Sequence, residues 1–228
     1  MKRSEINRAL REMEAMLAEY RFALPPFCYY TPEEWQTKGH DHDEIRDNML
    51  GWDITDYGLG DFEKVGFSLI TLRNGNLAKG DVIPQDVCRE AAVSQGGQYS
   101  PNHFHWHKME DIINRGGGTL LIRVYNSLPD ESIDRESDVT VHTDGVTRVV
   151  PAGTQLRLTP GMSISIQPGL YHDFEVEPGS GNVLIGEVSQ CNDDNTDNRF
   201  EPPVGRFPAI EEDERPYRLL CNEYPAAE

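Results

Sequence analysis

Apolar residues recur every three or four positions at the start of the chain, as they do on one face of an α-helix. The stripe comprises Ile6, Leu10, Met13, Leu17 and Tyr20. We expect a helix that begins near Ser4, ends before Pro25 and packs on the outside of the remaining fold. A second short helix is expected in the segment TPEEW, where Thr31 provides an N-cap and Pro32 suits the first turn.

Beyond Asp53 the pattern changes to short apolar runs separated by glycine and proline. The runs occupy residues 64–75, 119–127, 138–153, 154–161, 162–169, 172–181 and 182–190. Many short strands, with no βαβ alternation and no glycine-rich phosphate loop, predict an all-β sandwich or barrel. We expect one domain over residues 1–228, with a helical extension over about residues 1–50. The polar segment 190–218 lacks periodicity, so we expect it either to cross the barrel as an ordered flap or to be mobile.

Composition excludes several classes of partner. Lys and Arg number 21 against 39 Asp and Glu, a formal net charge of -18 that disfavours binding to nucleic acid or an anionic membrane. The four cysteines form no CxxC pair, so neither a zinc knuckle nor a dithiol redox motif is present. The first residues mix charged with apolar side chains, unlike a secretory signal or a membrane span. We therefore expect a cytoplasmic protein with reduced thiols.

The stretch PNHFHWHKMEDIINRGGG, residues 101–118, carries the candidate chemistry. His103 and His105 stand at alternate positions, so they share one face of an extended strand. His107 would share that face only if the chain stayed extended beyond His105, so this pattern leaves open which of the three histidines bind. Glu110 follows five residues after His105. Imidazole and carboxylate together suit a divalent ion such as manganese, iron, cobalt, nickel or zinc, although a further ligand must come from elsewhere.

The spacing of this stretch resembles the first signature motif of the cupin superfamily. Gly97, His103, His105, Glu110 and Gly117 match its positions, and the run of glycines at 116–118 suits a turn that needs positive φ. The segment GMSISIQPGLYHDF resembles the second motif, although Gln167 stands where a proline is usual.

This resemblance implies a cupin jelly-roll barrel, or double-stranded β-helix. It also implies a metal site whose ligands are His103, His105, Glu110 and His172. The motif implies that residues 106–109 turn and that Glu110 returns toward the same centre on the next strand. His107 lies in this turn, where we expect either a neighbour of the site or a surface residue.

Longer segments are similar to the bacterial D-lyxose isomerase family. They are LPPFCYYTPEEW, NHFHWHKMEDIINRGGG and NRFEPPVGRFPAIEEDE. The similarity implies a manganese-dependent homodimer that interconverts D-lyxose with D-xylulose and D-mannose with D-fructose.

Two further residues are candidates for catalysis. Lys108 lies in the ligand turn, where it either stabilises a developing alkoxide or enediolate or is an exposed turn lysine. Glu187 interrupts the apolar run VLIGEVS, and we interpret it as a general base, with a structural ion pair as the alternative. We expect the turn at 178–182 to fold its strand back beside the strand that carries His172. The expected reaction is proton transfer through a cis-enediolate, with a metal-assisted hydride shift as the rival.

The polar flap supplies candidates for sugar binding. They are Asp194, Glu201, Arg206 and Arg215 for hydroxyl groups, and Trp106, Phe200 or Phe207 for an apolar face. Three other functions remain open: an iron-dependent cupin dioxygenase, a phosphosugar isomerase and a sugar-sensing or storage cupin. The strand region shows no cluster of Arg and Lys for a phosphate, which disfavours the second.

Overall fold

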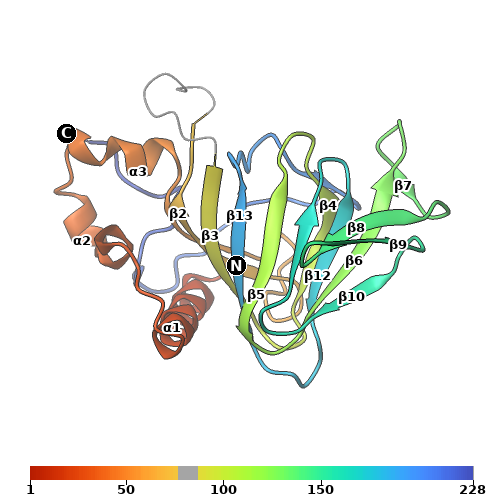
Figure 1. Cartoon of the computed structure of the whole chain (residues 1–228). Helices are drawn as coiled ribbons and strands as arrows, with labels where there is room; N and C mark the ends of the chain where they lie inside the picture. The colour runs from red at the N-terminus through yellow and green to blue at the C-terminus, as the bar shows by residue number, and fades with distance from the viewer. Residues whose placement is uncertain (77–86, 228) are drawn as a thin grey trace.

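Two curled β-sheets form the body of the computed structural model, which describes residues 1–76 and 87–227 (Figure 1). The larger sheet has the order β1 (Gly51–Thr55), β2 (Phe67–Arg73), β3 (Val87–Ser94), β13 (Val183–Gln190), β5 (Glu110–Gly117), β11 (Ser163–Ile166), β8 (Val139–Thr143) and β9 (Val146–Val150). The smaller sheet has the order β10 (Gln155–Leu158), β6 (Leu120–Ser127), β12 (Tyr171–Val176), β4 (Tyr99–Phe104) and β14 (Arg199–Phe200), and β7 (Ile133–Asp134) pairs with β6. From β4 to β6 and from β10 to β13 the chain alternates between the two sheets. This topology confirms the all-β jelly-roll barrel expected from the sequence.

One expected strand pairing is wrong. Strand β13, which carries Glu187, does not return beside β12 but lies between β3 and β5 in the larger sheet. The reason is that both edges of β12 are already paired, with β6 on one side and β4 on the other. The turn at 178–182 therefore carries the chain across to the opposite sheet. Gly117 has the expected positive φ of 90°, and a Cβ there would lie 2.0 Å from the carbonyl oxygen of Asn182.

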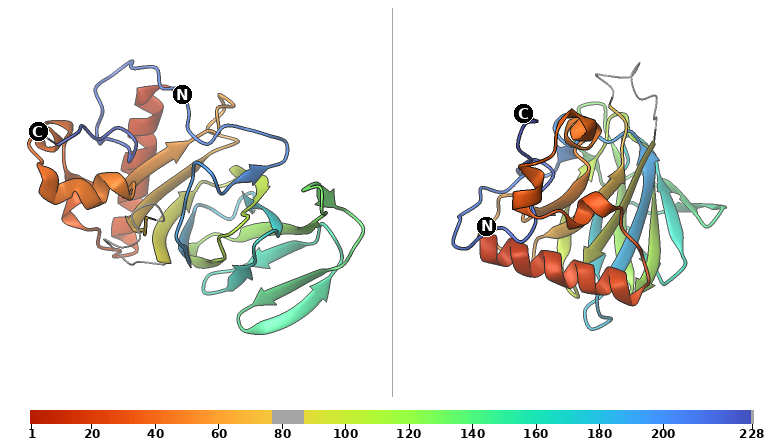
Figure 2. Two further views of the ribbon diagram at one scale, coloured as in Figure 1. Left: turned by 90° about the horizontal axis from the view of Figure 1, so that it is seen from above. Right: turned by 90° about the vertical axis from the view of Figure 1, so that its left-hand side faces the viewer.

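The helices gather at one side of the barrel (Figure 2). They are α1 (Arg3–Glu19), α2 (Pro32–Trp35) and α3 (Asp43–Asp47), with 3₁₀ turns η1 (Pro26–Tyr29) and η2 (His40–His42). Helix α1 contacts β1, β2 and β3, which confirms that the amino-terminal helix packs outside the barrel. Thr31 caps α2 as predicted, because its Oγ1 accepts from the Glu34 amide at 3.1 Å and its own amide donates to Glu34 Oε2 at 2.8 Å. No helix in the described ranges has the length and apolarity to cross a membrane.

Two apolar clusters hold these layers together. The first joins α1 to the larger sheet and includes Ile6, Leu10 and Trp52. The second fills the space within the barrel with residues of both sheets, such as Ile112 and Ile122. Members of the second cluster also border the pocket that contains the predicted ligands, so the barrel core supports the site directly.

The polar carboxy-terminal segment is ordered over the barrel. Its strand β14 pairs with β4, where Phe200 lies opposite His103. Farther along, the Cys221 amide donates to the Trp52 carbonyl at 2.8 Å, and the buried Arg3 guanidinium donates to Glu212 at 2.6 Å. Of the two expectations for this segment, the ordered flap is confirmed.

Candidate metal centre and active site

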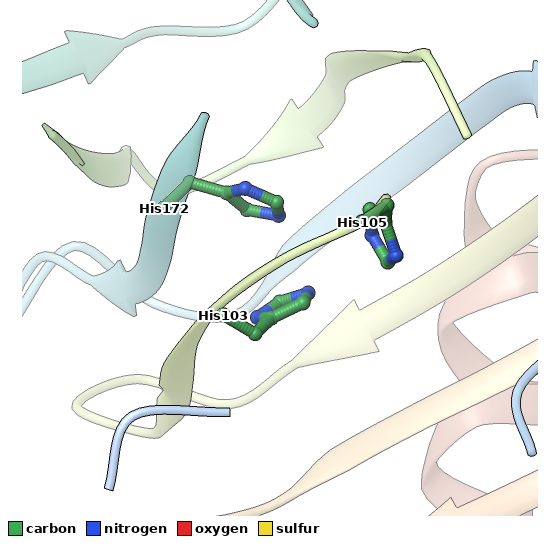
Figure 3. A group of neighbouring side chains, drawn as sticks. All are labelled: His103, His105 and His172. Atoms are coloured by element: carbon green, nitrogen blue, oxygen red, sulfur yellow. The ribbon is translucent and has the colours of Figure 1, made fainter. Parts of the chain in front are cut away.

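Three of the predicted ligands converge on two neighbouring strands of the smaller sheet. His103 lies on β4, His105 follows that strand directly, and His172 lies on β12. His172 is the register partner of His103 across the β12–β4 pair, so the two side chains leave the same face. All three imidazoles are buried, and one ring nitrogen of each lies within 4.8 Å of the others. Figure 3 shows the three rings gathered around a common space.

Hydrogen bonds fix which nitrogen of each ring faces this space. Each Nδ1 lies beside a main-chain carbonyl: His103 beside Pro101 O at 2.8 Å, His105 beside Asp197 O at 2.6 Å and His172 beside Leu170 O at 3.0 Å. A carbonyl oxygen only accepts, so each Nδ1 must carry the hydrogen. Each Nε2 of a neutral ring then presents a lone pair, as a metal ligand requires. Burial, together with the neighbouring imidazoles, lowers the pKa of His103 well below its usual value and keeps that ring neutral.

Glu110 supplies the carboxylate. It is the first residue of β5, and its Oε1 lies 3.0 Å from His172 Nε2 while its Oε2 lies 3.4 Å from His105 Nε2. Among the described residues, neither of these two nitrogens nor Glu110 Oε1 has a hydrogen-bond partner. Buried acceptors at such separations repel one another unless a cation lies between them. The set of three nitrogens and one carboxylate fits a divalent transition-metal ion.

Lys108 is buried between two acidic side chains. Its Nζ lies 2.8 Å from Glu110 Oε2 and 3.0 Å from Glu187 Oε1, and the residue is only 5% exposed. The alternative of an exposed turn lysine is therefore wrong. Glu187 stands beside the ligands as expected, although it reaches them from β13 in the larger sheet. Burial alone would raise the pKa of Glu110, but the Lys108 ammonium holds it well below its usual value.

Asp197 organises the turn between the ligands, a role that the sequence did not indicate. Its Oδ1 accepts from the amides of Trp106 at 2.8 Å and His107 at 3.0 Å, and its Oδ2 accepts from the Lys108 amide at 2.9 Å. These bonds fix the direction in which the lysine side chain enters the site. The His107 side chain is exposed, so this residue lies beside the site rather than within it.

A small pocket with a cavity volume of about 50 Å³ lies over three of the candidate ligands, His103, His105 and Glu110. Its polar lining includes Glu90, Glu187, Asp194, Asn198 and Arg206, and its apolar lining includes Phe67, Leu69, Phe174 and Phe200. Polar groups on one part of the wall and apolar carbon on another suit a small hydroxylated molecule.

The structure separates the predicted sugar-binding residues into two groups. Asp194, Arg206 and Phe200 line the pocket, and the Arg206 guanidinium donates to Asp194 at 3.0 Å and to Asp53 at 2.6 Å. The remaining residues stand apart from that lining. Arg215 is 89% exposed and pairs with Glu33, while Phe207 lies under the Arg206 guanidinium at 5.1 Å.

Glu201 and Trp106 are also absent from the described pocket lining. Glu201 pairs with Arg199 at 3.4 Å, and the Trp106 Nε1 donates to Glu131 at 2.9 Å. Both side chains therefore have partners at the rim of the barrel.

Sequence reasoning also missed Glu90. This residue lies on β3 and is the register partner of Glu187 across the β3–β13 pair. The signal that identified Glu187, a carboxylate inside a strand, was present in the run VCREAAVS. The adjacent Arg89 and Glu90 interrupt the apolar pattern there, so that run was not predicted as a strand.

Comparison with known proteins identifies the family. The family model described as D-lyxose isomerase matches residues 1–224. A D-lyxose/D-mannose isomerase from Serratia proteamaculans is 45% identical, and one from Escherichia coli O157:H7 is 44% identical; each alignment covers 98% of both chains. The L-ribose isomerase of Acinetobacter sp. DL28, solved in complex with L-ribose, shares the fold with a TM-score of 0.63 at 15% identity, over 92% of this chain and 98% of that one. The chain therefore belongs to the D-lyxose isomerase family.

Proposed function

We propose that this protein is a metal-dependent isomerase of free sugars that interconverts D-lyxose with D-xylulose and D-mannose with D-fructose. Membership of the family supports an aldose–ketose isomerase, and the two relatives near 45% identity carry both sugars in their names. One observation carries the metal dependence: three buried imidazoles gather within 4.8 Å, and the Nε2 atoms of His105 and His172 face the buried Glu110 carboxylate without a hydrogen-bond partner among the described residues.

His103, His105, His172 and Glu110 would hold the ion, for which we propose manganese. Bound there, a divalent cation would polarise the neighbouring C1 and C2 oxygens of an open-chain sugar and make the C2 hydrogen more acidic.

Glu187 removes the C2 proton and later delivers it to C1, so that the reaction passes through a cis-enediolate. Lys108 contacts both Glu110 and Glu187, which places its ammonium where it stabilises the negative charge that develops on the sugar oxygens. Glu187 is 12% exposed and lines the pocket, so a sugar can reach it.

Other pocket residues orient the sugar. Arg206 lines the pocket, where its guanidinium is a candidate donor to a sugar hydroxyl. Asp194 and Asn198 provide further polar groups, while Phe67 and Phe174 face the carbon chain.

We further propose a homodimer in the cytoplasm. Cys28, Cys88 and Cys221 are buried free thiols, which suit a reducing compartment. Light scattering of the purified protein tests the dimer.

Restoring single metals to the stripped protein tests the function. D-lyxose and D-mannose are assayed with manganese, cobalt or iron, beside their phosphates. We expect turnover of the free sugars only after metal is restored. Full activity of the stripped protein, or conversion of the phosphates alone, would refute the proposal. In deuterated water, the proton held on Glu187 can exchange with solvent before it reaches C1, so a single turnover should place deuterium at C1 of the ketose, whereas its absence would favour a hydride shift.

The pocket disfavours a phosphosugar substrate. Its two described cations, Lys108 and Arg206, each contact two carboxylates, so neither is free to balance a phosphate dianion. Oxygen consumption with a catechol or thiol would instead reveal a dioxygenase, and sugar binding without turnover would indicate a sensing protein.

A further inference from the structure

We propose that Glu90 is a second catalytic carboxyl group, which in its protonated form moves the hydroxyl proton between O2 and O1 while Glu187 moves the carbon-bound proton. This inference rests on the proposed isomerase function and adds a residue to its mechanism.

The strand register places the two carboxyl groups on the same wall of the pocket. Glu90 on β3 pairs directly with Glu187 on β13, and both residues line the cavity over the candidate ligands. Directly opposed residues of antiparallel strands point to the same face with Cβ atoms about 4.5–5.5 Å apart. A sugar carbon chain in this pocket therefore meets both groups at once.

The two oxygens of Glu90 have different surroundings. Oε1 accepts hydrogen bonds from Thr71 Oγ1 at 2.8 Å, Cys88 Sγ at 3.2 Å and Asn192 Nδ2 at 3.5 Å. Oε2 accepts no hydrogen bond from any described residue, and it is not fully enclosed by protein. Because Oε1 is held as an acceptor, a proton on this group resides on Oε2, which is open to the pocket.

The distribution of charge favours the protonated form. Lys108 contacts Glu110 and Glu187, and Arg206 contacts Asp53 and Asp194.

Glu90 is 7% exposed and contacts neither cation among its described partners. Burial, followed by repulsion from Glu187 and Asp194, raises the pKa of Glu90 to about 8. At neutral pH this side chain has a proton to donate.

The transfers balance as follows. Glu187 takes the C2 hydrogen as a proton, the electron pair of that bond forms the C1–C2 double bond, and the π electrons of the C1 carbonyl move onto O1 to give the enediolate. The Oε2 proton of Glu90 then passes to O1. The Glu90 carboxylate then takes the proton of the O2 hydroxyl as the C2 carbonyl forms, and Glu187 returns its proton to C1. Both side chains recover their starting states, and no oxidant or reductant is needed.

Glu90→Gln tests the inference on the manganese-loaded protein with D-lyxose. Glutamine keeps the size and the Oε1 acceptor but cannot transfer a proton. We expect kcat to fall about 10²- to 10⁴-fold with KM within a few-fold of wild type and with unchanged metal content. Glu136→Gln makes the same substitution in an exposed loop and should retain wild-type kinetics.

The pH profile gives a readout that a purely structural role would not move. The active form is protonated, so kcat/KM should fall as the pH rises through about 8, and Glu90→Gln should lack this fall. The charged or titratable groups around Glu90 are Glu187, Lys108, Asp194 and Cys88. Thr71→Val removes a donor that stabilises the carboxylate, so it should shift the fall to higher pH.

Wild-type kcat in Glu90→Gln, or an unchanged alkaline fall in that variant, overturns the inference alone. If Glu90→Gln does not fold, the pH profile of Thr71→Val provides the test. An alkaline fall in kcat/KM at the same pH as in wild type then overturns the inference. A wild-type protein that converts neither D-lyxose nor D-mannose instead overturns the proposed function.

Discussion

Replacing Lys108 with methionine removes the cation that contacts two buried carboxylates. The side chain is 5% exposed, and its Nζ lies 2.8 Å from Glu110 and 3.0 Å from Glu187. Methionine retains the length and the apolar packing of the lysine stem, so the substitution mainly tests charge.

Loss of one partner from a buried ion pair costs about 3–5 kcal/mol, because the other charge is left without compensation. In a protein of this size a loss of 1 kcal/mol lowers Tm by about 2–4 °C. We therefore expect metal-free Lys108→Met to melt about 6–20 °C below the metal-free wild type. Bound manganese would supply a new cation to Glu110 but not to Glu187. The difference in Tm between Lys108→Met and wild type should therefore become smaller in the presence of manganese without disappearing.

Thermal unfolding of both proteins, with and without manganese, measures these differences. Lys64→Met is the matched control, because that side chain is 81% exposed and its loss should cost less than about 1 kcal/mol. If the free energy of unfolding of metal-free Lys108→Met lies within about 1 kcal/mol of that of the metal-free wild type, the Lys108 charge does not stabilise the two buried carboxylates as argued.

Three other substitutions test separate parts of the site. His172→Ala removes a buried imidazole ligand and should weaken manganese binding more than about 100-fold in calorimetry, since even partners of metal ligands contribute 10- to 100-fold. Glu187→Gln should lower kcat about 10²- to 10⁴-fold while metal content stays constant. Arg206→Leu leaves Asp53 and Asp194 without their cation, so urea denaturation should show a loss of about 3–5 kcal/mol, with a higher KM.

Each of these experiments has a clear opposing result. Wild-type manganese affinity in His172→Ala would remove that residue from the ligand set, and His40→Ala, at an exposed position, controls for loss of an imidazole. Glu187→Gln with the kcat of Glu136→Gln would exclude the base role. An unchanged KM in Arg206→Leu would indicate that the guanidinium serves only stability.

Local patterns predicted the ligand cluster and most of the strands. Alternation on one strand brings His103 and His105 to one side, and a short turn returns Glu110, so the proximity of these three candidate ligands needed no knowledge of distant pairing. The helix that includes Leu10 and the cap at Thr31 were likewise encoded within a few residues.

Contacts between distant segments were less predictable. Glu90 meets Glu187 only through the register of β3 with β13, and no local pattern encodes which residues lie opposite each other in such a pair. Lys108 is in a turn, where lysines are usually exposed, and the flap that carries Asp197 fixes the turn that directs it inward. The prediction that Glu187 lies near the candidate ligands is confirmed, but the predicted pairing of its strand with the strand of His172 is wrong.

The division of the site between two sheets has a consequence for its evolution. His103 and His172 belong to the smaller sheet, whereas Glu90 and Glu187 belong to the larger one. Glu110, the fourth proposed ligand, also belongs to the larger sheet, so a bound ion would join the two sheets. The distance between the imidazoles and the two carboxyl groups is set by the apolar side chains packed inside the barrel, such as Ile122. Substitutions that add or remove a few methyl groups in that interior would change this distance, and with it the length of sugar that fits, while every polar residue stays the same.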